Sequence, residues 1–313
     1  RNLMRVAIIG RTDILLKTAQ HLHKSGYTIP LVITSTKSDY DELPNNAYQN
    51  FAKDINANYI DTKTLNTPTT KKKIKSSNCD YAVSMNWATL IKPETLNLFK
   101  KGILNIHPGD LPRYRGNATV NWAILNEEKQ IGLTIHLMTE KLDEGPIVKK
   151  EYFNLKKNTY VGDVYEWIKE ISPTLVNQSL IGLDSNKIKL SEQSKTGINP
   201  MRCFPRKPED SHINWNQPSQ TILKLIRASS KPFLGAYSIL DPLNKKAVIW
   251  KAIATNTDYE YHAIPGQVCY AENGYPVIAS KDGLIKIIDS NIDTLSSDAS
   301  LKLITSSFRN RLG

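Results

Sequence analysis

The chain lacks the features that mark several common protein classes. Its 313 residues contain only three cysteines, Cys79, Cys203 and Cys269, with no CxxC pair, so neither a disulfide framework nor a zinc site is expected. There is no run of eighteen apolar residues, which argues against a transmembrane helix. The first ten residues show no apolar segment followed by a small-residue cleavage site. We therefore expect no signal peptide and a cytoplasmic location.

Three familiar site signatures are also missing. Gly10 follows an apolar segment, but the residues after it lack the GxGxxG spacing of a dinucleotide site. Neither a GxxxxGK[ST] phosphate loop nor the GxSxG elbow of a serine hydrolase occurs. These absences disfavour dinucleotide-dependent redox chemistry and hydrolysis by a nucleophilic serine.

Acidic residues are in the minority. The chain has 41 Lys and Arg against 30 Asp and Glu, a net charge of +11 and a pI of about 9.3. A basic balance favours anionic partners, such as nucleic acid, a phosphorylated substrate or a polyglutamylated cofactor, without choosing among them. The densest cluster, Lys71–Lys73 with Lys75, lies on a predicted helix and is most simply a solvated face.

The first half of the chain alternates strand and helix patterns. Strands are predicted over residues 4–9, 28–34, 81–85, 102–106, 132–138 and 146–153. Helices are predicted over residues 12–24, 51–57, 68–75, 93–99, 117–126 and 161–181, the last interrupted at Pro173. This alternation predicts an α/β fold, with a Rossmann-like, mostly parallel sheet covered by helices on both faces.

The composition and the periodicity of the sequence change after residue 184. A polar, weakly periodic stretch is followed by a predicted helix over 220–229, short strands over 235–240, 246–252, 266–270, 276–279 and 284–288, and a helix over 298–308. Short strands at this spacing predict a small barrel, OB-like in character. We therefore expect a catalytic domain over residues 1–185, a linker over 186–207 and a smaller C-terminal domain over 208–313.

Asn105 and His107 stand where a predicted strand breaks into a loop rich in proline. Residues i and i+2 of a strand point to the same side, so these two project together while Ile106 turns into the core. Asn offers amide donors, and His offers a proton carrier that can be tuned across neutral pH. The end of a buried strand is where open α/β proteins place their chemistry. A strand-end loop with a capping Asn and an exposed His is the alternative.

Asp143 lies in a turn after the strand predicted over residues 132–138. A carboxylate beside an imidazole fixes its tautomer and stabilises its protonated form. An amide, an imidazole and a carboxylate could thus converge on one reacting carbonyl, although an ordinary turn Asp explains Asp143 equally simply. His136, inside an alternating strand, is expected to be structural, and Asp110 is expected to be a surface residue.

Taken in order, these motifs resemble those of the folate-dependent formyltransferases. They read Asn105-x-His107-Pro108-x-x-Leu111-Pro112-x-Tyr114-Arg115-Gly116 and Leu142-Asp143-x-Gly145-Pro146-Ile147. The second half is similar to the family's C-terminal domain over residues 208–215 and 226–236. The resemblance implies transfer of a formyl group from N10-formyltetrahydrofolate to an amine, with Asn105, His107 and Asp143 as the catalytic trio and no metal.

The chain departs from the family at two places. Gly109-Asp110 stands where members most often have Ser-Leu, and Ser211 and Asn214 stand where Gly and Asp are usual. The first departure bears on the hydrogen bonding of the loop and leaves the trio intact.

The resemblance also implies where the folate cosubstrate binds. Its pterin is expected against Met85, Asn86, Trp87, Leu90, Leu137, Met138 and Leu142. An apolar, aromatic strand end over residues 85–87 suits a flat ring. Packing of Trp87 in the core is the alternative.

Two groups of the family differ in the amine they formylate. One acts on the amino sugar of a nucleotide-linked sugar, for surface polysaccharide such as lipopolysaccharide, and the other on initiator methionyl-tRNA. The tRNA enzymes carry a basic insertion after the second strand, whereas residues 35–44 here hold three acids and one base, which a phosphate backbone would repel. We therefore favour the sugar substrate. The high pI favours tRNA, which stays the main alternative, with other amines behind it.

A nucleotide-sugar site must hold a pyrophosphate, for which arginine is suited. The candidate substrate residues are Arg113, Tyr114, Arg115, Gly116, Asn117, Arg206 and Lys207. Solvated cations are the alternative, and Arg115 is also placed to brace the loop. A non-catalytic RNA-binding protein would explain the charge, but its basic runs lack interleaved aromatics and the trio is left unexplained. Folate and an amino sugar are the expected partners, with no membrane, and a homodimer is a family expectation.

Overall fold

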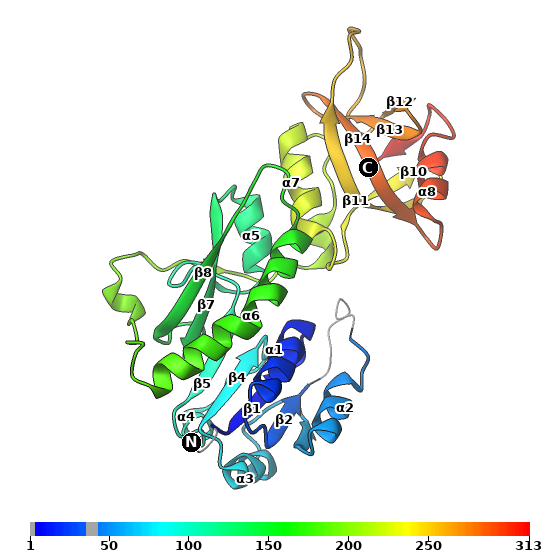
Figure 1. The fold of residues 1–313 in the computed structure, drawn as a ribbon. Helices are drawn as coiled ribbons and strands as arrows, with labels where there is room; N and C mark the ends of the chain where they lie inside the picture. The colour runs from blue at the N-terminus through cyan, green and yellow to red at the C-terminus, as the bar shows by residue number, and fades with distance from the viewer. Residues whose placement is uncertain (1–3, 36–42) are drawn as a thin grey trace. The chain divides into compact units, whose positions relative to one another are not determined.

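The computed structural model describes residues 4–35 and 43–313, and they form two compact units. Unit 1 comprises residues 1–119, 129–154 and 165–204, whereas unit 2 comprises residues 120–128, 155–164 and 205–313. Figure 1 shows the order of the elements along the chain.

Unit 1 is built on a seven-stranded sheet with the strand order β3-β2-β1-β4-β5-β7-β8. Its strands are β1 (Val6–Gly10), β2 (Leu31–Thr34), β3 (Asn58–Asp61), β4 (Tyr81–Met85), β5 (Ile103–His107), β7 (Gln130–Leu137) and β8 (Ile147–Asn154). The pairs from β3 to β5 are parallel, and β7 and β8 are antiparallel. The predicted α/β class with a mostly parallel sheet is confirmed.

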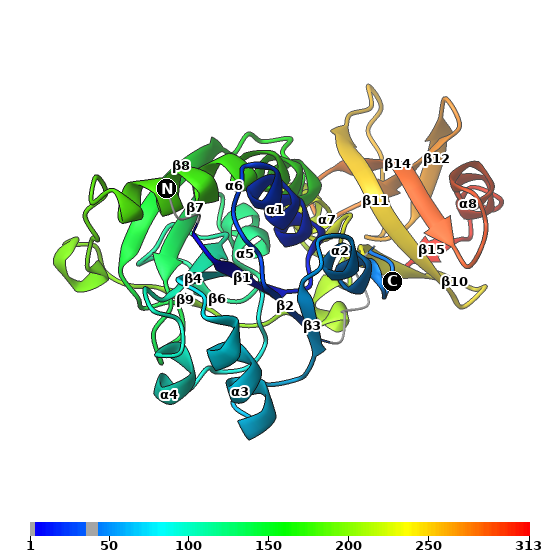
Figure 2. The same ribbon diagram turned by 60° about the horizontal axis from the view of Figure 1, so that its bottom comes forward.

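Helices cover both faces of this sheet. They are α1 (Asp13–Lys24), α2 (Ala47–Asp54), α3 (Pro68–Ser77), α4 (Pro93–Leu96) and α6 (Val161–Asp184), whose first turn belongs to unit 2. Figures 1 and 2 show α1 and α6 side by side, where Lys169 pairs with Asp13 at 2.6 Å. On the opposite face, α3 contributes Ile74 to a core cluster with Ile9 and Ile33.

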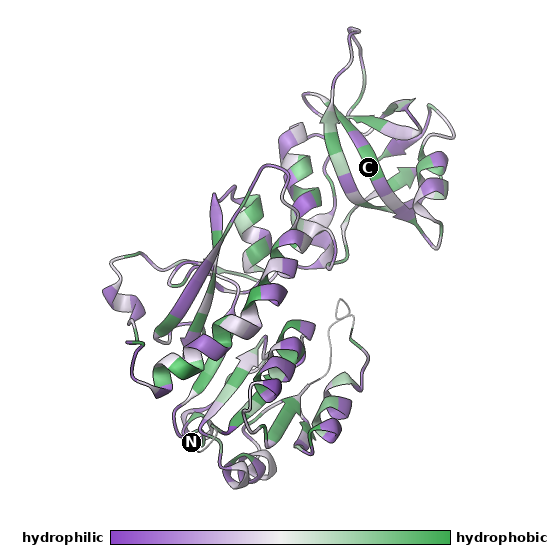
Figure 3. Cartoon of the chain, in the orientation of Figure 1, coloured by the Kyte–Doolittle hydropathy of each residue, from purple (hydrophilic) through white to green (hydrophobic). Residues whose placement is uncertain are grey.

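The sequence explains why these elements form. Val6 and Ile8 alternate with Ala7 and Ile9, and all are buried, because both faces of the sheet are covered. Figure 3 shows β2 apolar along its length, while α1 and α2 mix apolar and polar residues. Thr12 caps α1 by accepting the Leu15 N–H at 3.1 Å.

The helix predicted to break at Pro173 does not break. α6 runs without interruption from Val161 to Asp184, so this prediction is wrong. A proline inside a helix costs about 3 kcal/mol or more. Ile168, Leu175, Val176 and Leu180 on either side of it are all buried, and burying each such side chain contributes about 1.5–3 kcal/mol. Packing thus outweighs the lost hydrogen bond.

The stretch predicted as a linker has structure of its own as far as Phe204, and this part belongs to unit 1. A 3₁₀ turn, η1 (Gln193–Lys195), is followed by β9 (Arg202–Cys203). β9 pairs in parallel with β6 (Arg115–Gly116), so the chain returns to the predicted catalytic loop. The polar composition did not predict this pairing, because β9 pairs with backbone groups of β6 that lie far away in the sequence.

Unit 2 contains a six-stranded antiparallel sheet with the order β12-β13-β14-β11-β10-β15. Its strands are β10 (Ala236–Asp241), β11 (Lys245–Thr255), β12 (Val268–Glu272), β13 (Tyr275–Ala279), β14 (Leu284–Ile292) and β15 (Arg311–Leu312). A bridge between Gln267 and Arg311 links the two ends of this order, which gives the predicted barrel-like closure.

The helical elements of unit 2 are mostly short. They are α5 (Thr119–Leu125), η2 (Pro208–Ser211), α7 (Ser219–Ser229) and α8 (Ser297–Ile304). α7 and α8 contribute Ile226 and Ile304 to the core of the barrel. Among the helices of the described part of the chain, none is both long and apolar enough to cross a bilayer.

Candidate active site

The first three polar side chains of the site come from the adjacent strands β5 and β7. Asn105 pairs with His136 in an antiparallel register, and His107 pairs with Thr134. Residues that are directly opposite in such a pair project to the same face of the sheet. Asn105, His107 and His136 are 8%, 4% and 1% exposed. The sheet therefore gathers an amide and two imidazoles in a buried position.

Asp143 reaches the same place from the loop between β7 and β8. Its Oδ1 lies 3.7 Å from His107 Nδ1 and 3.7 Å from His136 Nε2. Its Oδ2 accepts the Gly116 N–H at 2.8 Å. The side chains of Asn105, His107 and Asp143, predicted from two separate stretches of sequence, are thus brought together.

Both ring nitrogens of His107 face protein groups. Nε2 lies 2.6 Å from the carbonyl oxygen of Tyr114. A carbonyl only accepts, so Nε2 carries a proton and donates it. Nδ1 faces the Asp143 carboxylate, a group that accepts hydrogen bonds. The backbone therefore holds Nε2, and Nδ1 is the ring nitrogen on the side of the carboxylate.

His136, expected to be structural, belongs to the same cluster. Its Nδ1 donates to the Leu137 carbonyl at 3.1 Å, which leaves Nε2 to accept from Asn105 Nδ2 at 3.2 Å. Burial first, and then the neighbouring His107, lower the pKa of His136 to about 4, against the opposing effect of Asp143. A neutral His136 thus orients the Asn105 amide. This role could not be predicted from the sequence, because a strand that is buried on both faces shows no alternation to mark which residues face the site.

Asp110 is an anchor for the loop and not a free surface residue as expected. Lys150 Nζ donates to its carboxylate at 2.8 Å and also contacts the Leu111 carbonyl, and the Tyr152 hydroxyl donates at 3.1 Å. Burial, and then the neighbouring Asp110 carboxylate, raise the pKa of Tyr152 to about 12. These bonds tie the loop after His107 to β8.

Arg115 and Gln193 brace the loop that carries Asp143. Arg115 donates from Nε and Nη2 to Gln193 Oε1 at 3.0 and 2.8 Å, and its Nη1 lies 3.5 Å from Glu144 Oε1. Gln193 Nε2 donates to the carbonyls of Asp143 and Gly145, both at 2.8 Å. The bracing alternative for Arg115 is therefore realised. Gln193 was missed because a single glutamine in a polar stretch gives no signal in the sequence.

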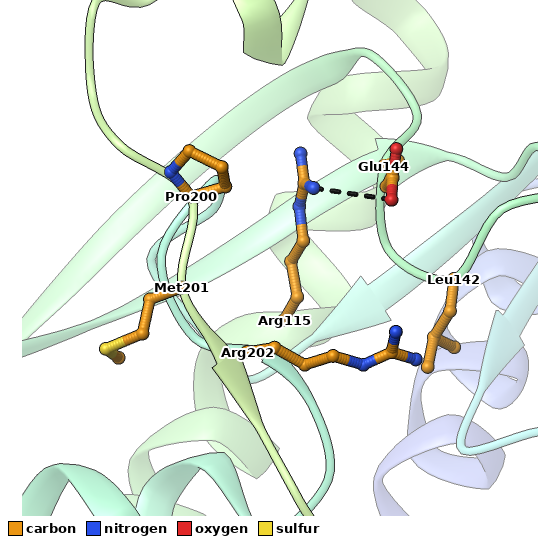
Figure 4. Close-up of a pocket in the computed structure, with 6 residues that line it drawn as sticks. All are labelled: Arg115, Leu142, Glu144, Pro200, Met201 and Arg202. Atoms are coloured by element: carbon orange, nitrogen blue, oxygen red, sulfur yellow. Dashed lines mark ion pairs between the residues drawn. The ribbon is translucent and has the colours of Figure 1, made fainter.

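A pocket of about 220 Å³ opens beside this loop (Figure 4). It is lined by Arg115, Leu142, Glu144, Pro200, Met201 and Arg202. Leu142 and Glu144 flank Asp143, so the pocket adjoins the loop of the predicted catalytic carboxylate. In Figure 4 the Arg202 side chain extends toward Leu142, and Arg115 faces Glu144. Arg202 was not among the predicted residues.

The other candidates of the loop are placed as follows. The Arg113 guanidinium lies 5.6 Å from the centre of the Tyr114 ring, and Tyr114 is 3% exposed. Gly116 has a φ of +97°, and the Asn117 N–H donates to the Cys203 carbonyl at 3.1 Å. Tyr114, Gly116 and Asn117 thus contact the protein through backbone groups.

The predicted pterin residues lie around the ends of β4 and β7. Met85 is buried at the end of β4, whereas Asn86 and Leu90 are exposed in the loop that follows. Trp87 and Met138 pack against the core cluster of α3, and Leu137 ends β7. Trp87 thus contacts the core, and contact of these residues with a pterin stays a prediction.

Two buried polar atoms at the end of β4 have no partner within the described residues. They are Ser84 Oγ and Trp87 Nε1. Ser84 pairs in register with Asn105 across β4 and β5, so its hydroxyl stands beside the predicted catalytic amide. The polar edge of a pterin offers partners of the kind that these two atoms lack.

Asn66, which the sequence did not single out, fixes the β4 loop. Its Nδ2 donates to the Leu90 carbonyl at 2.9 Å, and its Oδ1 accepts the Lys92 N–H at 3.0 Å. Like Gln193, it is an isolated amide that bonds both backbone groups and a side chain, here the Thr95 hydroxyl, which donates to Oδ1 at 2.9 Å.

Arg206 and Lys207 belong to unit 2. The Arg206 guanidinium lies 5.4 Å from the centre of the Trp122 ring and donates to the Asp210 carbonyl at 2.9 Å. Burial lowers the pKa of Arg206. The Lys207 N–H donates to Asp210 Oδ2 at 2.7 Å. Substrate binding by these two residues stays a prediction. Within residues 4–35 and 43–313, no group of three His, Cys, Asp or Glu is placed to hold a metal.

Two family models match the chain. The model of formyl transferase matches residues 4–180, and the model of the formyl transferase C-terminal domain matches residues 206–295. The chain belongs to the formyl transferase family. The resemblance predicted from the motifs is thereby confirmed.

The relatives agree with this assignment. The bifunctional polymyxin resistance protein ArnA of Wigglesworthia glossinidia brevipalpis is 32% identical over 201 residues, which cover 64% of this chain and 29% of ArnA. HypX from Aquifex aeolicus, in complex with tetrahydrofolic acid, has a TM-score of 0.68 at 18% identity, covering 95% of this chain and 47% of HypX. WlaRD, a sugar 3N-formyl transferase solved in the presence of dTDP and 5-N-formyl-THF, has a TM-score of 0.63 at 22% identity. This match covers 94% of this chain and 100% of WlaRD.

The identities and coverages limit what can be concluded from each relative. At such identities the two solved structures establish the fold alone. The chain spans less than a third of the length of ArnA and about half the length of HypX, whereas it matches the whole of WlaRD.

Proposed function

We propose that this chain transfers a formyl group from N10-formyltetrahydrofolate to the amine of a nucleotide-linked amino sugar. The observation that carries the proposal is the convergence of Asn105, His107 and Asp143, with His107 Nδ1 only 3.7 Å from the carboxylate. WlaRD, described as a sugar formyltransferase with dTDP and a formyl-folate, supports the sugar and the cosubstrate. Tetrahydrofolic acid in HypX supports the cosubstrate as well.

In this proposal each of the three groups has one task. A neutral amine attacks the formyl carbon, loses a proton, and N10 gains a proton as its bond to that carbon breaks. Asn105 donates to the formyl oxygen as negative charge develops there, a contribution of about 10²–10³ in rate. His107 accepts the proton of the amine at Nδ1 and returns it to N10, a contribution of about 10²–10⁴. Asp143 stabilises the imidazolium between these steps.

The cosubstrate fits the protein groups at the end of β4. The unpartnered Ser84 Oγ and Trp87 Nε1 are donors for the pterin edge, and the exposed loop over residues 86–90 leaves its face accessible. We assign the diphosphate of the sugar nucleotide to the side of the pocket beside Asp143, where Arg202 adds a cation.

Initiator-tRNA formylation is the second candidate, favoured by the pI of about 9.3. The argument against it rests on the acidic segment 35–44, of which residues 36–42 lie outside the described part of the chain. The acidic character of that segment is a property of the sequence alone. A non-catalytic RNA-binding protein is not retained, because family membership assigns an enzyme. A role in surface polysaccharide synthesis, a cytoplasmic location and a homodimer stay predictions.

A direct assay separates the substrates. The chain is incubated with N10-formyltetrahydrofolate and with dTDP-, UDP- and GDP-linked amino sugars or charged initiator tRNA, and the products are analysed by mass spectrometry. We expect one amino sugar to gain the mass of a formyl group, and His107→Ala to abolish this gain. Formylation of the tRNA alone would select the second candidate, and formylation of neither class would overturn the proposal.

A further inference from the structure

We propose that Gly109 sets the position of the His107 imidazole, because it leaves the space in which Nε2 reaches the Tyr114 carbonyl. The reading of His107 as the proton carrier rests on the proposed function, whereas its position does not.

The space around Gly109 is too small for any side chain. A Cβ there would overlap the Tyr114 carbonyl oxygen and would lie 2.5 Å from His107 Nε2 and 2.9 Å from His107 Cδ2. Gly109 is not among the residues with a positive φ, so its backbone conformation does not itself require glycine. A larger residue is excluded only by the His107 imidazole and by the Tyr114 carbonyl oxygen, which accepts a hydrogen bond from that ring.

The loop is held too firmly to move away from an added Cβ. The Gly109 N–H donates to the His107 carbonyl at 2.9 Å, and Thr134 Oγ1 donates to the Gly109 carbonyl at 2.6 Å. The next residue, Asp110, is tied to Lys150 and Tyr152 on β8. A side chain at residue 109 would thus press on both the His107 ring and the Tyr114 carbonyl that holds it, and the hydrogen bond between them would lose its geometry.

The consequence is a defined tautomer. With Nε2–H held by the Tyr114 carbonyl, the neutral ring keeps its lone pair on Nδ1, opposite Asp143. The proton taken up in the reaction then arrives at the nitrogen that faces the carboxylate. Gly109 is in this sense a positioning residue, which acts through His107 and touches no substrate.

Nuclear magnetic resonance of the full-length chain with ¹⁵N-labelled histidine tests this without substrate. Spectra of wild type and His107→Gln identify the signals of His107. We expect the neutral ring to be protonated at Nε2 and this proton to exchange slowly, since His107 is 4% exposed. A neutral His107 protonated at Nδ1, or a rapidly exchanging mixture of the two, would overturn the proposal even if the variants below failed to fold.

Gly109→Ala and Gly109→Ser provide the second arm. We expect both to lose the Nε2–H signal and to lower kcat roughly ten- to a hundredfold with little change in KM, as when a catalytic group moves by about 1 Å. Gly162→Ala is the matched control, because its Cβ would lie 2.7 Å from the Lys231 carbonyl oxygen within unit 2. It crowds a carbonyl in the same way and should leave the His107 signals unchanged.

The outcomes separate this inference from the proposed function. If Gly109→Ala keeps the wild-type tautomer of His107, the inference is wrong whatever the enzyme formylates. If the tautomer behaves as expected and no amino sugar is formylated, the proposed function fails and the role of Gly109 in positioning the ring stands.

Discussion

At the scale of single residues, the site holds two imidazoles with different hydrogen-bond partners. The rings of His107 and His136 lie 6.1 Å apart between their centres, so two positive charges there would repel each other. His136 donates to a backbone carbonyl and accepts from an amide, which suits a neutral ring. His107 faces Asp143 with Nδ1 and is suited to take up a proton. The neighbours of each ring thus fit the proposed roles, in which His136 orients Asn105 and His107 transfers the proton.

Removal of any one member of the trio should abolish most of the activity. Asn105→Ala, His107→Ala and Asp143→Ala are each expected to lower kcat at least about a hundredfold, from the loss of an oxyanion donor or an acid–base group. Steady-state kinetics with N10-formyltetrahydrofolate and the amino sugar that accepts the formyl group measure this. Asp184→Asn, at an exposed ion pair with Lys101, serves as the control and should keep the wild-type rate. A near-normal rate in a trio variant would remove that residue from the mechanism.

The buried His136 should make stability depend on pH. Its pKa is lowered from 6.5 to about 4 in the folded protein, so between these values the unfolded chain binds a proton that the folded chain does not. The free energy of unfolding should therefore fall as the pH drops from about 6.5 toward 4. His136→Gln, neutral at every pH, should flatten this part of the curve, as measured by urea unfolding at several pH values. His23→Gln, at an exposed position, should not. An equally steep curve for His136→Gln would contradict the assignment.

At the scale of elements, loops are joined by amide side chains and short strand pairs. The two-residue pairing of β6 with β9 brings residues 193–203 beside the loop of Arg115. Gln193 then links this segment to Arg115, Asp143 and Gly145 through all of its polar atoms. The position of the predicted catalytic carboxylate thus depends on a residue fifty positions further along the chain.

Gln193→Ala should destabilise the protein and impair the reaction. It leaves the buried carbonyls of Asp143 and Gly145 without their donor, and each such group costs about 1–3 kcal/mol. We expect a loss of roughly 2 kcal/mol or more in the free energy of unfolding, with a lower kcat as Asp143 loses its support. Gln178→Ala, at an exposed glutamine that accepts a hydrogen bond from Lys149, should change stability by less than about 0.5 kcal/mol. Equal effects of the two substitutions would contradict this role of Gln193.

At the scale of the whole molecule, the two units are not two consecutive pieces of chain. Residues 120–128 and 155–164 lie between segments of unit 1 in the sequence but belong to unit 2. There Asn121 Nδ2 donates to the Ala228 carbonyl at 2.7 Å, and Lys224 pairs with Glu127 at 3.1 Å. The interleaving means that a cut in the sequence near residue 204 does not separate complete units.

A chain that ends at Phe204 should therefore be poorly folded. It keeps Val120, Ala123, Val161 and Val164, all buried in the full chain, but lacks residues 205–313 of their unit. We expect it to bind a hydrophobic dye and to aggregate, as exposed apolar patches do. Addition of the fragment 205–313 should reduce the dye binding, whereas an unrelated protein should not. A monomeric, dye-free chain of residues 1–204 would show that unit 1 closes its own core.

The sequence by itself determined the motifs and most of the elements, although the strands β3, β6 and β9 were not predicted. Strands such as β4 and helices such as α1 follow from local periodicity and capping, and Asn105 and His107 share a face because a strand has a period of two. The tertiary structure alone decided that His136, Gln193 and Tyr114 meet these residues, and that Arg115 braces the loop. Those contacts require the pairing of β5 with β7 and of β6 with β9. Such pairings join segments far apart in the chain, so no local pattern encodes them.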